Sequence, residues 1–321
     1  MALSETLRYF DLRGRGEWRV IELNSEWNDY WRTARGERRE VDPTGTDVIA
    51  PFFLAEGPAP GDVGPVLDLG CGAGALSQRL IKSNYPHSQF LGVDLSHDAA
   101  HMTASKTKGL AIQGDLANLP LAANTIDWAV SQFALEYASF NAWAEAGRVV
   151  KPGGRLTVVA HAHGSLIYME HEKALVDFST LDQIIHTSLK RDPTGEPAAV
   201  VSERVLVQAI EQLRAMVGDQ PGGLARPMSE ALLGVLTHYS GGKGLPSSDE
   251  LGSLRRWLKD YKFYKARVES MLRAAMTPSD FMGVQQSLVN TGFTVRTAGF
   301  LTAPGGGILG FKLSASKNTY L

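Results

Sequence analysis

The chain has 321 residues, of which 44% are hydrophobic, with 32 Lys and Arg against 34 Asp and Glu. This length is enough for one large domain or two smaller ones. The nearly balanced charge gives no argument for bulk attraction to nucleic acid or to a membrane surface. The single cysteine, Cys71, excludes an internal disulfide framework and cysteine-rich zinc sites. The first residues lack the apolar stretch of a signal peptide, and no run of about 18 apolar residues occurs. We therefore expect a cytoplasmic protein without a membrane span.

The N-terminal residues 1–47 are polar and charged, with aromatic side chains spread among them. The segment 25–31 contains three aromatic residues whose spacing predicts a short helix with one aromatic face. Four arginines follow at 32–39, and then an apolar stretch at 48–55. We interpret residues 1–47 as a cap over a pocket.

A buried strand that runs into a glycine turn is the most informative stretch of the chain. Residues 65–69 are apolar apart from Asp68, and glycines occupy alternate positions of the turn 70–74. A helix is predicted directly behind them, at 75–84. Glycine permits positive φ and the close approach of a ligand, so this strand–turn–helix is typical of a nucleotide-binding fold. The GxGxG spacing is not the GxGxxG of dinucleotide enzymes, which disfavours a nicotinamide-dependent oxidoreductase.

Strands and helices then alternate along the chain. Further strands are predicted at 90–94, 110–113, 126–131 and 155–160, with Ser96 as the N-cap of one helix, a second helix at 141–150 and a turn at 151–154. Such alternation predicts a parallel sheet with helices on both faces.

The alternation stops between residues 165 and 276. Apolar residues keep helical spacing in two stretches, 206–217 and 251–272, and loop signals fall at 191–197, 219–227 and 240–248. These patterns predict an insertion of three to five helices and no second sheet.

The sheet pattern returns at the C-terminal end. Thr277 and Pro278 predict the start of a helix, and Gly292 predicts its end. Two strands, 293–301 and 308–314, are joined by a Pro-Gly-rich turn and predict a β-hairpin.

In order and spacing, the glycine turn, Asp94, Gly114-Asp115, the run 131–137 and Lys151-Pro152-Gly153-Gly154 resemble the class I S-adenosylmethionine-dependent methyltransferases. The resemblance covers residues 48–163 and, more loosely, 277–315. It implies an α/β fold with a doubly wound, mostly parallel, seven-stranded sheet that the C-terminal hairpin completes. The resulting division is an N-terminal cap (1–47), a cofactor-binding core (48–164), a helical insertion or lid (165–276) and a closing helix and hairpin (277–321).

The same resemblance implies S-adenosyl-L-methionine as the cofactor. Asp94 is expected to accept the ribose hydroxyls, Asp115 the adenine amine, and Asp68 to help hold the methionine ammonium. Backbone N–H groups around the glycine turn are expected to face the carboxylate tail. The cofactor-binding residues that we expect are Asp68, Gly70, Cys71, Gly72, Asp94, Leu95, Asp115, Leu116 and Gln132. Cys71 is interpreted as a packing residue under the ligand rather than as a reactive thiol.

No motif announces a catalytic residue, because the cofactor supplies the reactivity and the protein mainly aligns the acceptor. Candidates for a general base follow the fourth and fifth strands: Glu136 and Tyr137, then His161 and His163. The alternative is a polar loop with one packed ring and histidines that cap or are solvated. The spacing of His and Glu at 161–172 matches no compact zinc signature, so no metal is expected.

We expect a methyltransferase that acts on a small molecule, with the acceptor, the acceptor atom and the type of methylation left open. The alternatives are an RNA or protein methyltransferase, which would use the basic N-terminal segment and the basic, aromatic stretch 255–273, or a non-methylating protein that binds adenosylmethionine. An amphipathic helix with buried rings explains the same stretch without nucleic acid. The sequence does not choose between a monomer and a homodimer.

Overall fold

The structure, a computed structural model, describes residues 7–10, 18–21, 27, 31, 47–86, 89–191, 197–200, 203–219, 225–240 and 248–319. The chain divides into two compact units. The sheet unit comprises Met1–Tyr168 and Arg273–Leu321, and the helical unit comprises Met169–Leu272. No helix in the described residues is both long and apolar enough to cross a membrane.

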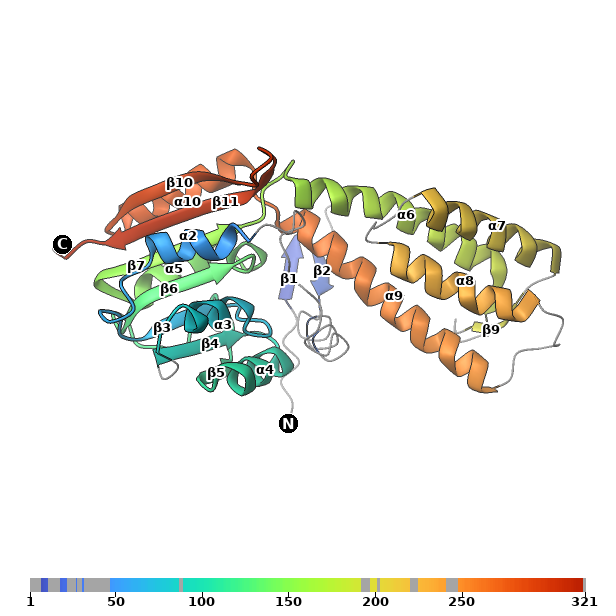
Figure 1. The fold of residues 1–321 in the computed structure, drawn as a ribbon, viewed down its shortest axis with the longest axis horizontal. Coiled ribbons are helices and arrows are strands. Elements are labelled where there is room, and N and C mark those ends of the chain that lie inside the picture. The colour runs from blue at the N-terminus through green and yellow to red at the C-terminus, as the bar shows by residue number, and fades with distance from the viewer. Residues whose placement is uncertain are drawn as a thin grey trace. The chain divides into compact units, whose positions relative to one another are not determined.

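A seven-stranded mixed sheet organises the sheet unit, in the order β10-β11-β7-β6-β3-β4-β5 (Figure 1). Its strands are β3 (Val66–Leu69), β4 (Phe90–Asp94), β5 (Leu110–Gln113), β6 (Ile126–Gln132), β7 (Val150–Ala160), β10 (Phe293–Thr302) and β11 (Ile308–Lys317). The first five strands pair in parallel, and β10 and β11 join antiparallel to β7. The predicted α/β sheet with a closing hairpin is confirmed.

Helices cover both faces of this sheet because its parallel strands are apolar on both sides. Residues of α5 (Asn141–Val149) and α10 (Pro278–Asn290) share one hydrophobic cluster with β3 and β7. Residues of α2 (Ile49–Glu56) and α3 (Ala75–Lys82) form a second cluster around Trp128. The remaining helix, α4 (His97–Thr107), packs beside α3 and β5.

Two predicted helix starts are confirmed in detail. The Ser96 side chain accepts a hydrogen bond from the Ala99 N–H at 3.3 Å, which caps α4. Thr277 and Asp280 form a reciprocal capping box at the start of α10, with Pro278 in the first turn. Each cap satisfies N–H groups that have no partner inside the helix.

The prediction of a turn at 151–154 was wrong. Strand β7 begins at Val150, five residues before the predicted start, and includes this stretch. Ile126 of β6 pairs with Val150 and Trp128 pairs with Arg155, so β7 has extra residues that bulge between these two pairs. Gly153 has a φ of +79°. Because both turns and this bulge need a residue that adopts positive φ, the glycine of the bulge predicts a turn from the sequence.

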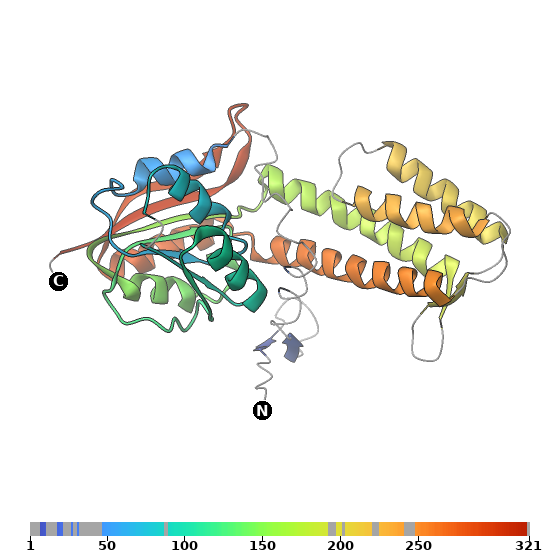
Figure 2. The ribbon, with the colours of Figure 1, turned by 60° about the horizontal axis from the view of Figure 1, so that its bottom comes forward.

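The helical unit contains four helices among its described residues, in agreement with the predicted insertion. They are α6 (Leu166–Ser188), which begins in the sheet unit, α7 (Glu203–Asp219), α8 (Arg226–Ser240) and α9 (Ser248–Ala274), which ends there. Figure 2 shows α6 and α9 side by side, where Phe178 contacts Tyr261. The expectation of no second sheet was wrong in one respect, since β8 (Leu189–Arg191) and β9 (Pro197–Val200) form a short antiparallel pair.

The N-terminal segment contains a short antiparallel pair, β1 (Leu7–Phe10) and β2 (Trp18–Ile21). Of the aromatic helix predicted at 25–31, only Trp27 and Trp31 lie in the described residues, and both are helical. The arginines at 32–39 lie outside the described residues.

The buried sheet generates a stability prediction. Leu67 of β3 is fully buried in the main cluster, and Leu67→Ala is expected to lower the free energy of unfolding by about 2–5 kcal/mol, because it leaves a cavity in the packed sheet. The matched control is Leu110→Ala, because Leu110 is 73% exposed and its truncation is expected to change stability by about 0.5 kcal/mol or less. Urea unfolding measures both, and equal losses would contradict the packing of β3.

Candidate active site

The candidate residues meet at one edge of the sheet. Because β3, β4, β5, β6 and β7 run parallel, their carboxyl ends lie along the same edge. This is where open α/β sheets bind their ligands. The predicted cofactor and acceptor residues lie at the end of β3 and in the turn after it, at the end of β4 and directly after it, in the loop after β5, at the end of β6 and after it, and after β7.

The turn after β3 requires its glycines. Gly70, Gly72 and Gly74 have φ values of +69°, +51° and +77°, a region that other residues rarely adopt. A Cβ on Gly72 would lie 2.7 Å from the ring of Trp31, and a Cβ on Gly70 would collide with the side chain of Ala134. The turn is therefore packed closely against the N-terminal segment and against the residues that follow β6.

Three of the turn amides that are expected to face the carboxylate tail have hydrogen-bond partners within the chain. The N–H groups of Gly70 and Cys71 donate to the carbonyl oxygen of Val93, at 2.8 and 3.1 Å, and the N–H of Gly72 donates to the Asp94 carboxylate at 2.9 Å. These three donors bind β4 and are not free to hold a carboxylate tail. They instead fix the turn against the residue that is expected to bind the ribose.

Asp94 is the best-placed polar group of the site. One carboxylate oxygen accepts from Gly72 and the other accepts from the N–H of Ser96 at 2.8 Å. Each carboxylate oxygen has two lone pairs, so each keeps one for a ligand hydroxyl. The side chain is buried, and burial raises its pKa from 3.8 to about 6.

Asp68 lies at the centre of the sheet edge, almost fully buried. Its carboxylate accepts a hydrogen bond from the Ser77 hydroxyl at 2.6 Å. The pKa of Asp68 is raised to about 6, chiefly by burial and to a smaller extent by the nearby charge of Asp94. Two buried acids in one small region favour a ligand with positive charge.

Cys71 has the environment of a packing residue. The side chain is buried, and a Cβ on Gly92 of β4 would lie 2.7 Å from its sulfur. Burial raises the pKa of the thiol, which disfavours the reactive thiolate.

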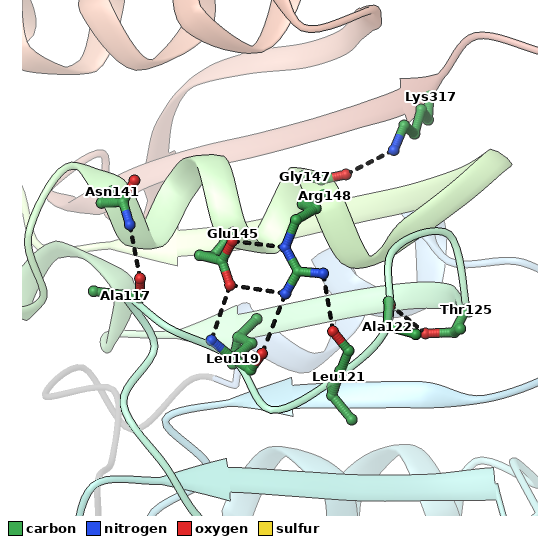
Figure 3. Close-up of polar contacts among 10 residues, drawn as sticks. All are labelled: Ala117, Leu119, Leu121, Ala122, Thr125, Asn141, Glu145, Gly147, Arg148 and Lys317. Atoms are coloured by element: carbon green, nitrogen blue, oxygen red, sulfur yellow. Dashed lines mark hydrogen bonds and ion pairs between the residues drawn. The ribbon is translucent and has the colours of Figure 1, made fainter.

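Figure 3 shows how α5 holds the loop after β5. The Arg148 guanidinium donates to the carbonyl oxygens of Leu121 and Leu119, at 2.9 and 3.2 Å, and pairs with the Glu145 carboxylate at 2.6 Å. Glu145 in turn accepts from the Leu119 N–H, and the Asn141 amide donates to the Ala117 carbonyl oxygen at 2.7 Å. These bonds fix the loop without using the residues that are expected to contact adenine.

Those residues lie at the start of the same loop. Asp115 is exposed, and one of its oxygens accepts from the Ala117 N–H at 2.8 Å. The side chain of Leu116 is buried in the main cluster. Leu95, which is expected to pack on the adenine, is half-buried after β4, and its carbonyl oxygen accepts from the Gln113 amide.

Gln132 ends β6 with an unsatisfied side chain. It is buried, and among the residues that the structure describes neither its amide oxygen nor its amide nitrogen has a hydrogen-bond partner. Buried amides are normally hydrogen-bonded, so we expect a polar group of the ligand to supply the missing partners of this side chain.

The acceptor-side candidates divide into a buried pair and two outer residues. Nδ1 of His161 lies 2.6 Å from the Glu136 carboxylate, and both side chains are buried. Tyr137 packs its ring edge-on against His161, with centroids 5.6 Å apart, and against Trp27 on its other side. His163 is exposed and contacts Tyr168.

Three residues of the site carry no signal in the sequence. Phe133 has a φ of +52° although it is not glycine, and it turns the chain from β6 toward the glycine turn. The hydroxyl of Ser77 in α3 donates to Asp68, and the ring of Trp31 lies against Gly72 from the N-terminal segment. Only the aromatic spacing of the N-terminal segment hints at Trp31.

The donor and acceptor set fits S-adenosylmethionine. The carboxylate of Asp94 retains acceptor capacity for a diol, the buried acid Asp68 complements a cationic ligand, and the Gln132 amide has both donor and acceptor capacity unused. The assignment of individual contacts to these residues stays a prediction.

The polar support in Figure 3 generates one prediction. Arg148→Met removes the bonds that hold Leu119 and Leu121, so we expect faster amide hydrogen exchange in residues 117–121. Affinity for S-adenosylhomocysteine is expected to fall by about threefold to tenfold, because the loss of one or two net hydrogen bonds loosens the loop. Arg226→Met, which breaks a surface pair with Glu230 far from this loop in the sequence, is the control. Unchanged exchange in 117–121 would contradict the role of Arg148.

The buried acids generate a prediction for stability. A folded-state pKa raised from 3.8 to about 6 means that Asp68 and Asp94 hold protons more tightly in the folded chain. Their protonation therefore contributes stability that is fully present below the ordinary pKa and is lost as pH rises through about 6. Asp94→Asn removes one such group, so its stability relative to the wild type should be more favourable at pH 7 than at pH 4.5, by about 1–3 kcal/mol. Urea unfolding at the two pH values measures this, and the same difference at both would refute it.

Known proteins resemble part of this chain. Residues 67–158 match the family model described as a methyltransferase domain. A malonyl-[acyl-carrier protein] O-methyltransferase of Hahella chejuensis is 27% identical over 165 residues, which are 48% of this chain and 59% of that protein. A demethylmenaquinone methyltransferase of Corynebacterium kroppenstedtii is 38% identical over 104 residues, 32% of this chain and 42% of that protein.

Among solved structures, an S-adenosylmethionine-dependent methyltransferase from Mesorhizobium loti is 15% identical, with a TM-score of 0.43, over 84% of this chain and 99% of that one. The chain spans less than two thirds of the length of the two curated relatives named above. The matched region contains β3 to β7 up to residue 158, and so the glycine turn, Asp94 and Gln132. Residues 67–158 are therefore similar to a methyltransferase domain, and the order of the seven-stranded sheet agrees with the class I methyltransferase fold that the sequence predicts.

Proposed function

We propose that this protein transfers the methyl group of S-adenosylmethionine to a small-molecule acceptor. One observation carries the proposal: the Asp94 carboxylate, held by the N–H groups of Gly72 and Ser96, keeps its remaining lone pairs at the ligand-binding edge of the sheet. When bound, the cofactor supplies an activated methyl group on a positive sulfur. The residues of the chain then bind, orient and exclude water, which is the main demand of methyl transfer.

The nature of the acceptor is supported by two of the relatives. Their names give a malonyl group on an acyl-carrier protein and demethylmenaquinone as acceptors. We infer that the N-terminal segment covers such an acceptor. Two contacts support this role: the ring of Trp31 lies against Gly72, and the ring of Trp27 lies against Tyr137.

The environment of α9 argues against the alternative of RNA as the substrate. Trp257 and Tyr261 are buried in the core of the helical unit, stacked on each other, and so cannot stack on bases. Among the described side chains of the same helix, the exposed ones are five basic residues and one acid: Arg255, Arg256, Lys259, Lys262, Arg273 and Asp260. This is the pattern of an amphipathic helix with a solvated basic face.

The proposal predicts the effect of removing the Asp94 carboxylate. Asp94→Ala is expected to weaken binding of S-adenosylhomocysteine by at least about tenfold, because a charge-assisted bond to a hydroxyl contributes roughly 1.5–3 kcal/mol. Isothermal calorimetry measures the affinity.

Two further variants separate binding from folding. Asp94→Asn keeps one carbonyl acceptor for the backbone N–H groups and is expected to fold while still binding weakly. Asp62→Ala removes an exposed acid after α2 and is expected to bind as the wild type does. The proposed function is wrong if the wild-type protein binds neither the cofactor nor its demethylated product.

A further inference from the structure

The pair formed by His161 and Glu136 is the most strongly built polar feature of the acceptor side. His161 directly follows β7, and Glu136 lies in the single turn η2 (Leu135–Tyr137) after β6. One oxygen of the Glu136 carboxylate accepts from the backbone N–H of His161 at 2.8 Å and lies 2.6 Å from Nδ1 of the same residue. A single carboxylate therefore fixes both the backbone and the ring of this histidine.

The shared oxygen defines the tautomer. The oxygen of a carboxylate can only accept, so it receives the backbone N–H and, in the tautomer that fits this contact, the Nδ1–H of the ring. The lone pair of the neutral ring is then on Nε2. Within the described part of the chain, no hydrogen-bond partner is found for Nε2. This arrangement matches the histidine of a catalytic triad, where a carboxylate on Nδ1–H leaves Nε2 to take a proton.

The pair of His161 and Glu136 lowers the stability of the fold, so a structural role does not explain it. The Glu136 side chain has no exposed surface, and its second oxygen has no hydrogen-bond partner among the described residues. A buried carboxylate with an unused lone pair lowers stability. The backbone of His161 is also held on its other side, since its carbonyl oxygen accepts from the N–H of Met276 at 2.9 Å. A hydroxyl or amide in place of Glu136 would satisfy the backbone N–H at lower cost.

The pair also lies next to the cofactor side. Ala134, two residues before Glu136, packs against Gly70 of the glycine turn so closely that a Cβ there would collide. Two rings contact His161: the Phe133 ring lies 4.3 Å from it by centroid, and the Tyr137 ring packs edge-on at 5.6 Å. Glu136 and Tyr137 are the ionisable side chains that are seen to contact the imidazole. A flat apolar acceptor with one acidic hydroxyl suits this environment.

We propose that His161 is the general base and Glu136 its positioning residue, and that the acceptor is a phenol. This proposal rests on the proposed function.

The O–H bond of the phenol breaks, and its proton goes to Nε2 of His161. The electron pair of the phenolate forms the bond to the methyl carbon, at the oxygen or at the conjugated ring carbon, and the carbon–sulfur pair returns to the sulfur. In the second case the ring carbon then gives up its own proton to water. Glu136 stabilises the imidazolium that forms. A carboxylic acid acceptor is already ionised at neutral pH and would need no base.

The test compares two acceptor panels with four proteins. Substituted phenols and the matched benzoic acids are offered with S-adenosylmethionine, and the release of S-adenosylhomocysteine and the methylated product are measured by mass spectrometry. The proteins are the wild type, His161→Asn, Glu136→Gln and, as the control, His101→Asn, which removes an exposed histidine of α4. Calorimetry with S-adenosylhomocysteine shows whether each cofactor site is intact.

We expect the wild type to methylate phenols and not benzoic acids. His161→Asn should lower kcat by about 100-fold or more at neutral pH, with KM nearly unchanged, and part of the rate should return as pH rises and the phenol ionises in solution. Glu136→Gln should lower kcat by about tenfold or more, and the kcat of His101→Asn should stay within about twofold of the wild-type value. If His161 had only a structural role, the kcat of the His161→Asn variant would not recover at high pH.

Three results would overturn the inference: methylation of benzoic acids, turnover with neither panel, or a His161→Asn variant that keeps more than about a tenth of the wild-type kcat. Intact binding of S-adenosylhomocysteine in the same proteins would leave the proposed function standing. Loss of that binding in the wild type would instead overturn the proposed function itself.

Discussion

The bond from the Gly72 N–H to the Asp94 carboxylate is the interaction on which the site depends. It joins the turn after β3 to the end of β4, across 22 residues of chain. Gly72 is held on two other sides, because its carbonyl oxygen accepts from the Thr103 hydroxyl of α4 at 2.8 Å and the Trp31 ring covers its α-carbon. A turn fixed in this way presents Asp94 in one position, and the lone pairs that remain on its carboxylate have a defined direction. The geometry is set by the backbone, so the cofactor side needs few particular side chains.

The sheet could be predicted from the sequence because its signals are local. Short apolar runs, the glycine turn and the caps at Ser96 and Thr277 each specify their own element, and the alternation of elements then permits few topologies. The exceptions are informative. Residues 151–154 have turn composition, but their neighbours at Val150 and Arg155 both pair with β6, so the strand continues through a bulge. The use of the Gly70 and Cys71 amides by Val93 was missed for the same reason, since the partner lies on another strand.

The candidate residues of the site could be predicted from the sequence, but the contacts between them could not. His161 and Glu136 are both candidates by position after a strand, yet nothing in the sequence pairs them across 25 residues. Phe133 gives no warning of its positive φ, and Ser77 gives none of its bond to Asp68. Such contacts depend on side-chain direction and on strand register, and both are decided by the packing of the whole sheet.

The two halves of this site are built by different means, and this has a consequence for specificity. In the proposed site, backbone amides, glycines and Asp94 form the cofactor half, whereas side chains after β6 and β7 form the acceptor half. The region that matches the methyltransferase domain ends at residue 158, just before His161, and relatives that share it are named for different acceptors. Replacement of side chains after β7 leaves the Gly72–Asp94 bond in place, because no atom of that bond belongs to them. The acceptor half can therefore change its chemistry while the cofactor half stays constant, and acceptor specificity must be sought in residues such as His161 rather than in the glycine turn.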